Sequence, residues 1–407
     1  MTVLDPYKNI DWNAVLYIQS MSHDHYDQRG GAEEGVDTLY SKGFRHFNWS
    51  EYRREEPFDN PQFPDDNYGS APTYPLSRWH TSPPQDIVNT PNCEIVRGMR
   101  NHHVCIGSKA SIIGRNWPDF GEPEDEEELL QSIWSVTLDD NILLSEPEIY
   151  KYILDGIDNP DGEGLIGGLL YPDAGGIVVA HRTENTLTIE NLDKHGERYL
   201  GMAIYNDRRS QSDPTMPGEN DKGYYVFSWD EVLATGRRCW GFGEADRGER
   251  CANILLTDDF SEYGVLKAYR DGRFYTKMNW ADTGLKFNRI EDTGSSLIVE
   301  CEAVQNGIKI ITEKGVVHES SSNSTEFTYP TTPSGEIDLT YVRVEALGAV
   351  FTDEQLPDEE WPVPNFRDGV RYEDEIYSQA IHFRSKKDVD LFKRKERTKK
   401  YFSAGLI

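Results

Sequence analysis

The residues of this chain most suited to chemistry are two histidines, His23 and His25, separated by Asp24. They follow the apolar run 15–18, which is typical of a buried strand. In an extended backbone, residues i and i+2 project from the same face, so both imidazoles can converge on one point. Imidazole is the commonest protein ligand for zinc and similar metals. The pair predicts a metal site at the end of a strand; two unrelated surface histidines are the alternative.

Further nitrogen and oxygen donors also stand at the ends of apolar runs in the first part of the chain. They are Glu51, Glu94, His102, His181 and Asp246. In a barrel of parallel strands, the ends of consecutive strands open onto one face, where active sites are built. Each residue alone is more often structural than a ligand. Together they predict one site, and mixed histidine and carboxylate ligation suits zinc, manganese or iron.

Two styles of sequence indicate the elements that position these residues. Up to about residue 258, short apolar runs alternate with segments of helical period, which favours parallel strands in a barrel or doubly wound sheet. Residues 145–154 predict a helix that begins at Ser145, and residues 124–134 predict an acidic helix. The segments 48–91 and 207–224 predict long loop insertions.

After about residue 259 the pattern changes to strand, turn and strand. Asp271-Gly272 between residues 264–269 and 273–278 predicts a β-hairpin, and alternating strands continue to about residue 385. We therefore expect a small antiparallel β-sandwich at 259–385, after a first domain at 1–258. The basic tail at 386–407 is either a solvated helix or a segment that docks on an acidic neighbouring subunit, which leaves a homo-oligomer open.

Composition excludes several classes of protein. The formal net charge is −29 over 407 residues, which disfavours binding to duplex nucleic acid. No apolar stretch approaches the roughly 20 residues that span a bilayer, and the first residues lack the pattern of a secretory signal. We therefore expect a protein made in the cytoplasm, without a membrane span. The five cysteines show no C-x-x-C spacing, which predicts reduced, buried thiols.

Taken in chain order, the donor residues resemble the PHP (polymerase and histidinol phosphatase) superfamily of metal-dependent phosphoesterases. The family's motifs correspond here to His23 and His25, Glu51, Glu94, His102, His181 and Asp246. Residues 201–206 and 229–233 also resemble segments of such barrels, and residues 341–345 and 376–381 resemble the sandwich that often follows them. The stretches 6–12 and 39–47 are similar to PHP-type proteins encoded by tailed phages. The resemblance implies a distorted seven-stranded β/α (TIM-like) barrel followed by the sandwich.

The chain departs from the family pattern at several positions. Tyr52 and Gly248 stand where the family has histidines, Arg182 where it usually has proline, and Ala203 where glutamate is frequent. The resemblance implies that His23, His25, Glu94 and Asp246 hold one metal ion, while Glu94 bridges to a second ion held by His102. A third site would keep Glu51 and His181 and lack two imidazoles. We therefore expect one or two divalent ions.

The activity that the resemblance implies is hydrolysis of a phosphate mono- or diester by metal-activated water. The catalytic residues would be Asp246, His181 and Arg182, whose guanidinium matches phosphate geometry; a surface salt bridge is the alternative for Arg182. The expected substrate is a phosphorylated small molecule or a cell-surface polymer. The rival function is a structural or host-surface-binding component of a phage tail, with other virion proteins as partners and a degenerate site.

Overall fold

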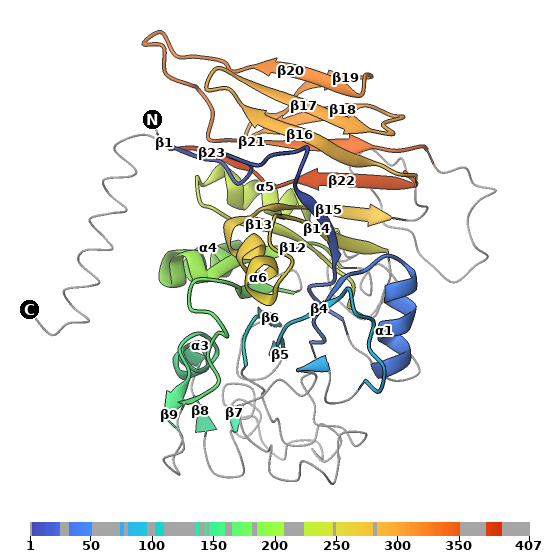
Figure 1. The fold of residues 1–407 in the computed structure, drawn as a ribbon. Coiled ribbons are helices and arrows are strands. Elements are labelled where there is room, and N and C mark those ends of the chain that lie inside the picture. Colours follow the sequence, from blue (N-terminus) through green and yellow to red (C-terminus); the bar gives the residue numbers. More distant parts are fainter. Residues whose placement is uncertain are drawn as a thin grey trace, which may run out of the picture.

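The computed structural model describes most of the chain. The described ranges are 2–24, 32–50, 74–76, 80–95, 102–109, 136–137, 143–144, 146–158, 165–180, 185–206, 224–246, 250–279, 283–350 and 372–384. They form a mixed α/β molecule with several β-sheets. Strands from the C-terminal part gather at one end, and helix α3 (Glu146–Leu154) lies toward the other (Figure 1).

A five-stranded sheet carries the middle of the chain. Its strands are, in order, β13 (Trp240–Glu244), β12 (Tyr199–Asn206), β11 (Gly176–Val179), β6 (His103–Ile106) and β5 (Glu94–Ile95). Strands β11, β12 and β13 run parallel, as the alternating pattern predicted, whereas β6 runs antiparallel to both of its neighbours. Every residue of β12 is buried, which is expected of a strand covered on both faces.

An eleven-stranded sheet contains both the first and the last of the described strands. Its main path is β4 (Val88–Asn89), β3 (His46–Phe47), β2 (Leu16–Ser20), β14 (Cys251–Thr257), β15 (Phe274–Asn279), β22 (Asp374–Ser378), β21 (Tyr341–Leu347), β23 (Ile381–Arg384) and β1 (Thr2–Leu4). Off this path, β18 (Ile308–Thr312) pairs with β21 and with β19 (Gly315–Ser320). Strands β2, β3 and β4 are parallel, and β14 is antiparallel to β2.

Smaller sheets complete the described strands. An antiparallel sheet of β16, β17 and β20 lies over the C-terminal part of the large sheet (Figure 1). The strand predicted at 297–301 is confirmed as β17 in this sheet, and those predicted at 308–312 and 340–345 are confirmed as β18 and β21 in the large sheet. Two short antiparallel pairs lie near α3. The bounds are β16 (Lys286–Asp292), β17 (Ser296–Glu302), β20 (Ser324–Thr328), β7 (Val136–Thr137), β8 (Leu143–Leu144), β9 (Ile157–Asp158) and β10 (Leu165–Ile166).

Both edge strands of the five-stranded sheet, β5 and β13, meet the eleven-stranded sheet without a continuous backbone ladder. At one edge the chain passes from β4 into β5, and the backbone nitrogen of Glu94 donates to the oxygen of Ser50 (3.0 Å). At the other edge, side-chain amides take the place of a neighbouring strand. The amide of Gln379 both donates to and accepts from the backbone of Gly241 (2.8 and 2.7 Å), and the amide of Asn253 does the same at Gly243 (2.9 and 3.0 Å).

The glycines of β13 let these amides and their strands approach closely. A Cβ atom added at Gly243 would lie 2.9 Å from Cγ2 of Thr276, and one at Gly241 would lie 2.8 Å from Cγ2 of Ile204. At β13 the two large sheets are thus joined by side-chain amides instead of a backbone ladder. For this reason, backbone hydrogen bonds among the described residues do not close the strands into a barrel, and the expected seven-stranded barrel is not shown in that form.

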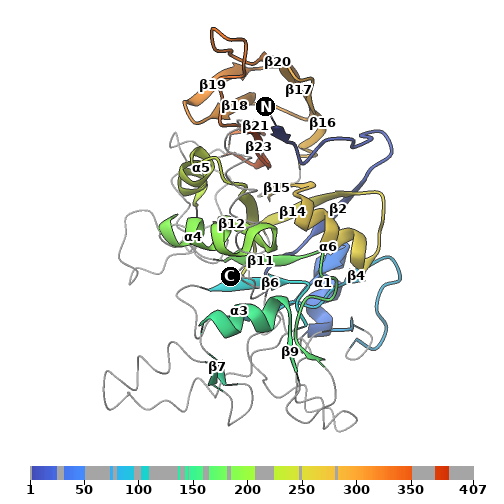
Figure 2. The same cartoon turned by 90° about the vertical axis from the view of Figure 1, so that its left-hand side faces the viewer.

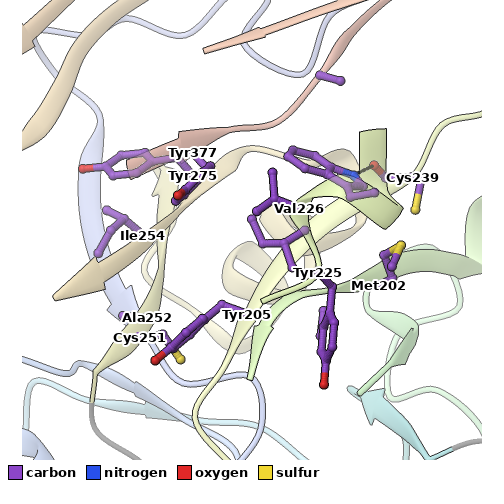
Figure 3. Close-up of a cluster of buried hydrophobic side chains, with 14 of the residues drawn as sticks. Met202, Tyr205, Tyr225, Val226, Cys239, Cys251, Ala252, Ile254, Tyr275 and Tyr377 are labelled. Carbon is purple, nitrogen blue, oxygen red and sulfur yellow. Dashed lines mark hydrogen bonds between the residues drawn. The ribbon is translucent and has the colours of Figure 1, made fainter. Parts of the chain in front are cut away.

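One core lies between the two large sheets. It takes buried apolar side chains from β2, β4, β6, β11, β12, β13 and β14, and it is completed by helix α6 (Glu262–Asp271). A second, larger core links the five-stranded sheet to the C-terminal strands. Figure 3 shows part of it, where side chains of β12, α5 (Val226–Ala234), β14, β15 and β22 meet in one buried cluster.

The other helices follow from their apolar spacing. Helix α5 buries Val226, Trp229, Val232 and Leu233, which lie on one helical face. The predicted helix at 145–154 is confirmed as α3. Helices α1 (Ala32–Ser41) and α4 (Asn185–His195), the latter continued by the 3₁₀ turn η4 (Gly196–Arg198), cover the sheets (Figure 2). The predicted helix at 124–134 lies outside the described residues, as do residues 51–73, 77–79 and 207–223 of the predicted loops.

The predicted hairpin around Asp271-Gly272 is wrong, because residues 262–271 form α6. The hydroxyl of Ser261 caps the helix by accepting from the backbone nitrogen of Gly264 (3.1 Å), and Gly272 ends it with a φ of 72°. Asp-Gly signals a tight turn with positive φ, and a helix end uses the same conformation. Only the strand that follows, β15, is confirmed.

Two expectations from composition can be compared with these elements. Among the described residues, no helix is long and apolar enough to cross a membrane. The five cysteines, all within the described ranges, are buried and form no disulfide, as predicted.

Candidate functional site

Four of the predicted donor residues come together at one end of the two large sheets. His23 follows β2, Glu94 begins β5, and Asp246 follows β13. His102 precedes β6, which runs opposite to β11; the backbone nitrogen of Ala180, just after β11, donates to the oxygen of His102 (3.0 Å). His102 therefore reaches the same edge from the start of its strand rather than from the end.

The imidazole of His23 lies inside a group of carboxylates. Its Nε2 lies 3.5 Å from Oε2 of Glu94 and 3.9 Å from Oδ1 of Asp246, and its Nδ1 lies 3.3 Å from Oε2 of Glu244. All four side chains are buried, with at most 3% of any of them exposed. The ring of His23 thus presents one nitrogen to Glu94 and Asp246 and the other to Glu244.

Glu94 stands between the two histidines. Its Oε2 faces His23, while its Oε1 lies 2.8 Å from Nδ1 of His102. The side chain of His102 is 34% exposed, so the buried cluster reaches solvent at this residue. Glu94 is therefore placed to share its two oxygens between two neighbouring groups.

Asp246 is held by its backbone and by an amide. Its backbone nitrogen donates to the oxygen of His23 (3.0 Å), and Nδ2 of Asn206 lies 3.2 Å from its Oδ2. The φ of Asp246 is 41°, a left-handed conformation that is uncommon for residues other than glycine. Unusual backbone of this kind concentrates at functional sites, where the surroundings hold it in place.

Side-chain amides also fix the backbone that leads into His23. Nδ2 of Asn92 donates to the backbone oxygen of Ser22 (3.0 Å) and to Oγ of Ser50 (2.8 Å). Nδ2 of Asn253 donates to Oγ of Ser22 (2.7 Å), and that hydroxyl lies 3.3 Å from Oε1 of Glu244. All of these residues are buried. The cluster is therefore rigidly supported from β2, β14 and the segment before β5.

The electrostatics of the cluster favour positive charge. Burial by itself lowers the pKa of His23, but the charges of Glu94 and Asp246 and hydrogen bonds to Glu244 and Glu94 raise that pKa well above its usual value. Burial raises the pKa of the Glu244 carboxyl, and its hydrogen bond to His23 lowers it in part. Three buried carboxylates thus surround one imidazole, an excess of negative charge that a cation can offset.

The donor types suit a divalent ion, but the described residues do not form a complete site for one. Within the described ranges, no group of three or more His, Cys, Asp or Glu side chains could hold a metal ion as it stands. The predicted ligands His25, Glu51 and His181 lie outside the described residues, as do the predicted catalytic residue Arg182 and the departures Tyr52 and Gly248. The donor atoms and the negative charge of His23, Glu94 and Asp246 suit a divalent ion, whereas the present arrangement of these three side chains does not hold one.

Sequence reasoning missed two residues of this cluster, Glu244 and Asn206. Glu244 ends the apolar run of β13 two positions before Asp246, so the signal that indicated Asp246 was also available for Glu244. Asn206 ends β12 in the same way. Glu244 lies outside the motifs on which the resemblance rested, whereas Asn206 ends the segment 201–206 that supported the resemblance and was not singled out as a site residue.

Comparison with known proteins gives little further information. No protein-family model and no curated protein matches the chain. Among solved structures it is similar to a two-domain protein from Bacteroides vulgatus that contains a predicted PHP-like metal-dependent phosphoesterase, with 11% identity and a TM-score of 0.37 over 83% of this chain and 88% of that one. A TM-score this low does not establish a shared fold. Nothing in the comparisons supports the expected origin in a tailed phage.

Proposed function

We propose that this protein is a metal-dependent phosphoesterase that hydrolyses phosphate mono- or diesters. The observation that carries the proposal is the convergence of His23, Glu94, His102 and Asp246, which come from three separate parts of the sequence, in one acidic cluster. These residues have the types and the chain order on which the resemblance to PHP phosphoesterases rests. Their convergence at one edge of the sheets is what that function requires.

In this proposal, His23, Glu94 and Asp246 hold one divalent ion together with His25. The two oxygens of Glu94, one toward His23 and one toward His102, suit a carboxylate that serves two ions. Zinc, manganese or iron fits this set of nitrogen and oxygen ligands. A bound ion of this kind supplies Lewis acidity and lowers the pKa of water.

The residues of the chain contribute positioning and charge. Asn206 binds Oδ2 of Asp246, which leaves Oδ1 directed to the side of His23. The exposed part of His102 marks where substrate enters the cluster. Arg182 and His181 are proposed to neutralise the phosphate oxygens and the leaving group.

The proposed function includes a finer description of the fold. We propose a distorted seven-stranded barrel in residues 1–258 and a β-sandwich in residues 259–385. The core shared by β2, β4, β6, β11, β12, β13 and β14 supports the barrel, because the strands of a small barrel fill their interior with side chains. The amides of Asn253 and Gln379 would then close the wall where the backbone ladder is interrupted.

The substrate proposed is a phosphorylated small molecule or a cell-surface polymer. The net charge of −29 repels long polyanions, so a compact or sparsely charged ester suits the protein better than duplex nucleic acid.

The test combines metal analysis with turnover. Elemental analysis of the purified protein and hydrolysis of nitrophenyl phosphate mono- and diesters, with added manganese, zinc or iron, would be measured for the wild type and for His23→Ala and Asp246→Asn. We expect both variants to lose bound metal and to lower turnover by roughly 100-fold or more. His318→Ala is the matched control, since His318 lies on β19 and bonds to Thr325.

Two results would refute the proposal. One is a wild type that binds no metal and hydrolyses none of these esters, which would leave a structural or surface-binding role. The other is a genuine activity that survives unchanged in His23→Ala.

A further inference from the structure

Glu244 lies beside the ring nitrogen of His23 that does not face Glu94 and Asp246. The Nδ1 atom of His23 lies 3.3 Å from Oε2 of Glu244, whereas Nε2 lies 3.5 Å from Glu94 and 3.9 Å from Asp246. The two nitrogens of an imidazole are chemically distinct, and the hydrogen bond made by one decides the role of the other. A carboxylate that accepts the proton of Nδ1 can therefore determine the role of Nε2.

We propose that Glu244 is a positioning residue, which accepts the Nδ1 proton of His23 and so directs Nε2 toward Glu94 and Asp246. The part of this proposal that concerns metal binding by His23 rests on the proposed function. The orientation of the ring is a property of the protein itself, with or without a metal. Glu244 touches neither substrate nor metal in this arrangement.

Glu244 is itself held on both sides. The Ser22 hydroxyl lies 3.3 Å from its Oε1, and Asn253 donates to that hydroxyl (2.7 Å). The same Asn253 amide binds the backbone of Gly243, the residue before Glu244. The carboxylate is fully buried and ends a strand, so it has little freedom to turn away from His23.

Such support matters because a histidine ligand needs one tautomer and one ring orientation. When a carboxylate accepts the proton of the second ring nitrogen, it fixes both and makes the first nitrogen a better donor. Removing a supporting group of this kind lowers metal affinity by roughly 10- to 100-fold.

The first experiment reads the Nδ1 proton of His23 directly. In protein with ¹⁵N-labelled histidine, we expect a far-downfield, slowly exchanging proton bonded to Nδ1 of His23, assigned by its loss in His23→Gln. In Glu244→Gln this signal should move upfield and exchange faster, because the acceptor no longer carries charge. Glu244→Asp, which keeps the carboxylate, should restore part of the shift.

Glu345→Gln is the matched control. Glu345 is another buried glutamate on a strand, and it pairs with Arg343 rather than with His23. Its replacement should leave the His23 signal unchanged. If Glu244→Gln fails to fold, Ser22→Ala tests the same point, since it removes the hydroxyl that holds Glu244 and should shift the signal in the same direction by a smaller amount.

The second experiment measures Mn²⁺ affinity by calorimetry. We expect Glu244→Gln to weaken binding by roughly 10- to 100-fold and Glu345→Gln to leave it unchanged. An unaltered Nδ1 signal and an unaltered affinity in Glu244→Gln would overturn the positioning role, even in an active enzyme. A wild type that binds Mn²⁺ but hydrolyses no ester would instead refute the proposed function. If the wild type binds no Mn²⁺, the Nδ1 signal alone decides the role of Glu244.

Discussion

Two buried acidic environments in this protein differ in what neutralises them. Around His23, three carboxylates share an imidazole, which provides a positive partner within hydrogen-bonding reach. Asp5, near the N-terminus, is half-buried with Asp292 as a charged neighbour, and its carboxylate accepts from the backbone nitrogen of Tyr7 (2.8 Å). Burial, and to a smaller extent Asp292, raises the pKa of Asp5 to about 6.

Asp5 is therefore expected to destabilise the fold at neutral pH. Its folded pKa of about 6 lies above the usual 3.8, so the folded state holds the proton more tightly, and stability falls as the pH rises from about 4 to 6. Asp5→Asn keeps the acceptor for Tyr7 without the charge. It should raise the free energy of unfolding at pH 8 by about 1–2 kcal/mol, after allowance for partial exposure, and by less at pH 5.

Urea unfolding at the two pH values measures this effect. Asp11→Asn is the control, because Asp11 is an exposed aspartate that likewise accepts from a backbone nitrogen two residues on. It should change stability by less than about 0.5 kcal/mol at either pH. An Asp5→Asn protein that is equally or less stable at pH 8 would contradict the raised pKa.

Single residues show how far sequence reasoning reaches into the site. Glu94 and Asp246 could be predicted because each lies within two residues of an apolar run, and their types suit metal binding. Glu244 carries the same signal, but a carboxylate in a strand cannot be assigned a partner until the ring of His23 is placed beside it. Asn92 and Asn253 were not predictable, since amides that bind backbone have no sequence pattern.

Among the elements, α6 shows how a local signal can predict the wrong structure. Residues 262–271 carry apolar positions that fit either a strand or a helix, and Asp271-Gly272 fits a turn or a helix end. Packing decides between them, because Val265, Leu266 and Tyr269 fill the core between the two large sheets. A strand in this place would turn alternate side chains away from that core.

Gly272, which ends α6, is expected to tolerate no side chain. Its φ is 72°, and a Cβ atom would lie 2.5 Å from Cε2 of Trp240 in β13. Gly272→Ala should therefore combine backbone strain with overpacking and destabilise the protein by about 2–4 kcal/mol. Thermal and urea unfolding measure the loss.

A second glycine separates the two causes. Gly294 has a φ of 87°, and nothing lies within 4 Å of an added Cβ atom. Gly294→Ala should thus cost only the backbone strain, about 1 kcal/mol. Equal losses for the two substitutions would show that contact with Trp240 contributes nothing.

At the scale of the whole molecule, the first described strand, the last one and strands from the middle of the chain form one sheet. Strand β1 pairs with β23, and β15 pairs with both β14 and β22. The hydroxyl of Tyr7 donates to the oxygen of Phe274 (2.9 Å) and accepts from the nitrogen of Gln379 (2.7 Å). Residues beyond 258 thereby complete the core and the wall that carry the candidate site.

A chain that ends at residue 258 is accordingly expected not to fold on its own. It would lack α6 and β15, which cover one core, and Gln379, which binds the backbone of β13. Near-ultraviolet circular dichroism and thermal unfolding should show no cooperative transition. A chain that ends at residue 384 retains every described strand and serves as the control.

A cooperative, native-like transition in the 1–258 chain would contradict this expectation. It would instead support an autonomous first domain with the boundary expected from the change of sequence style.

The sequence by itself determined the strands with clear apolar runs, several helices and the types of residue at the candidate site, because local periodicity and residue chemistry are written along the chain. Only the tertiary structure decided that residues 262–271 form a helix, that amides replace backbone pairing along β13, and that Glu244 lies beside Nδ1 of His23. Each of these depends on contacts between residues far apart in the sequence, where packing and hydrogen-bond satisfaction in the interior outweigh local preference.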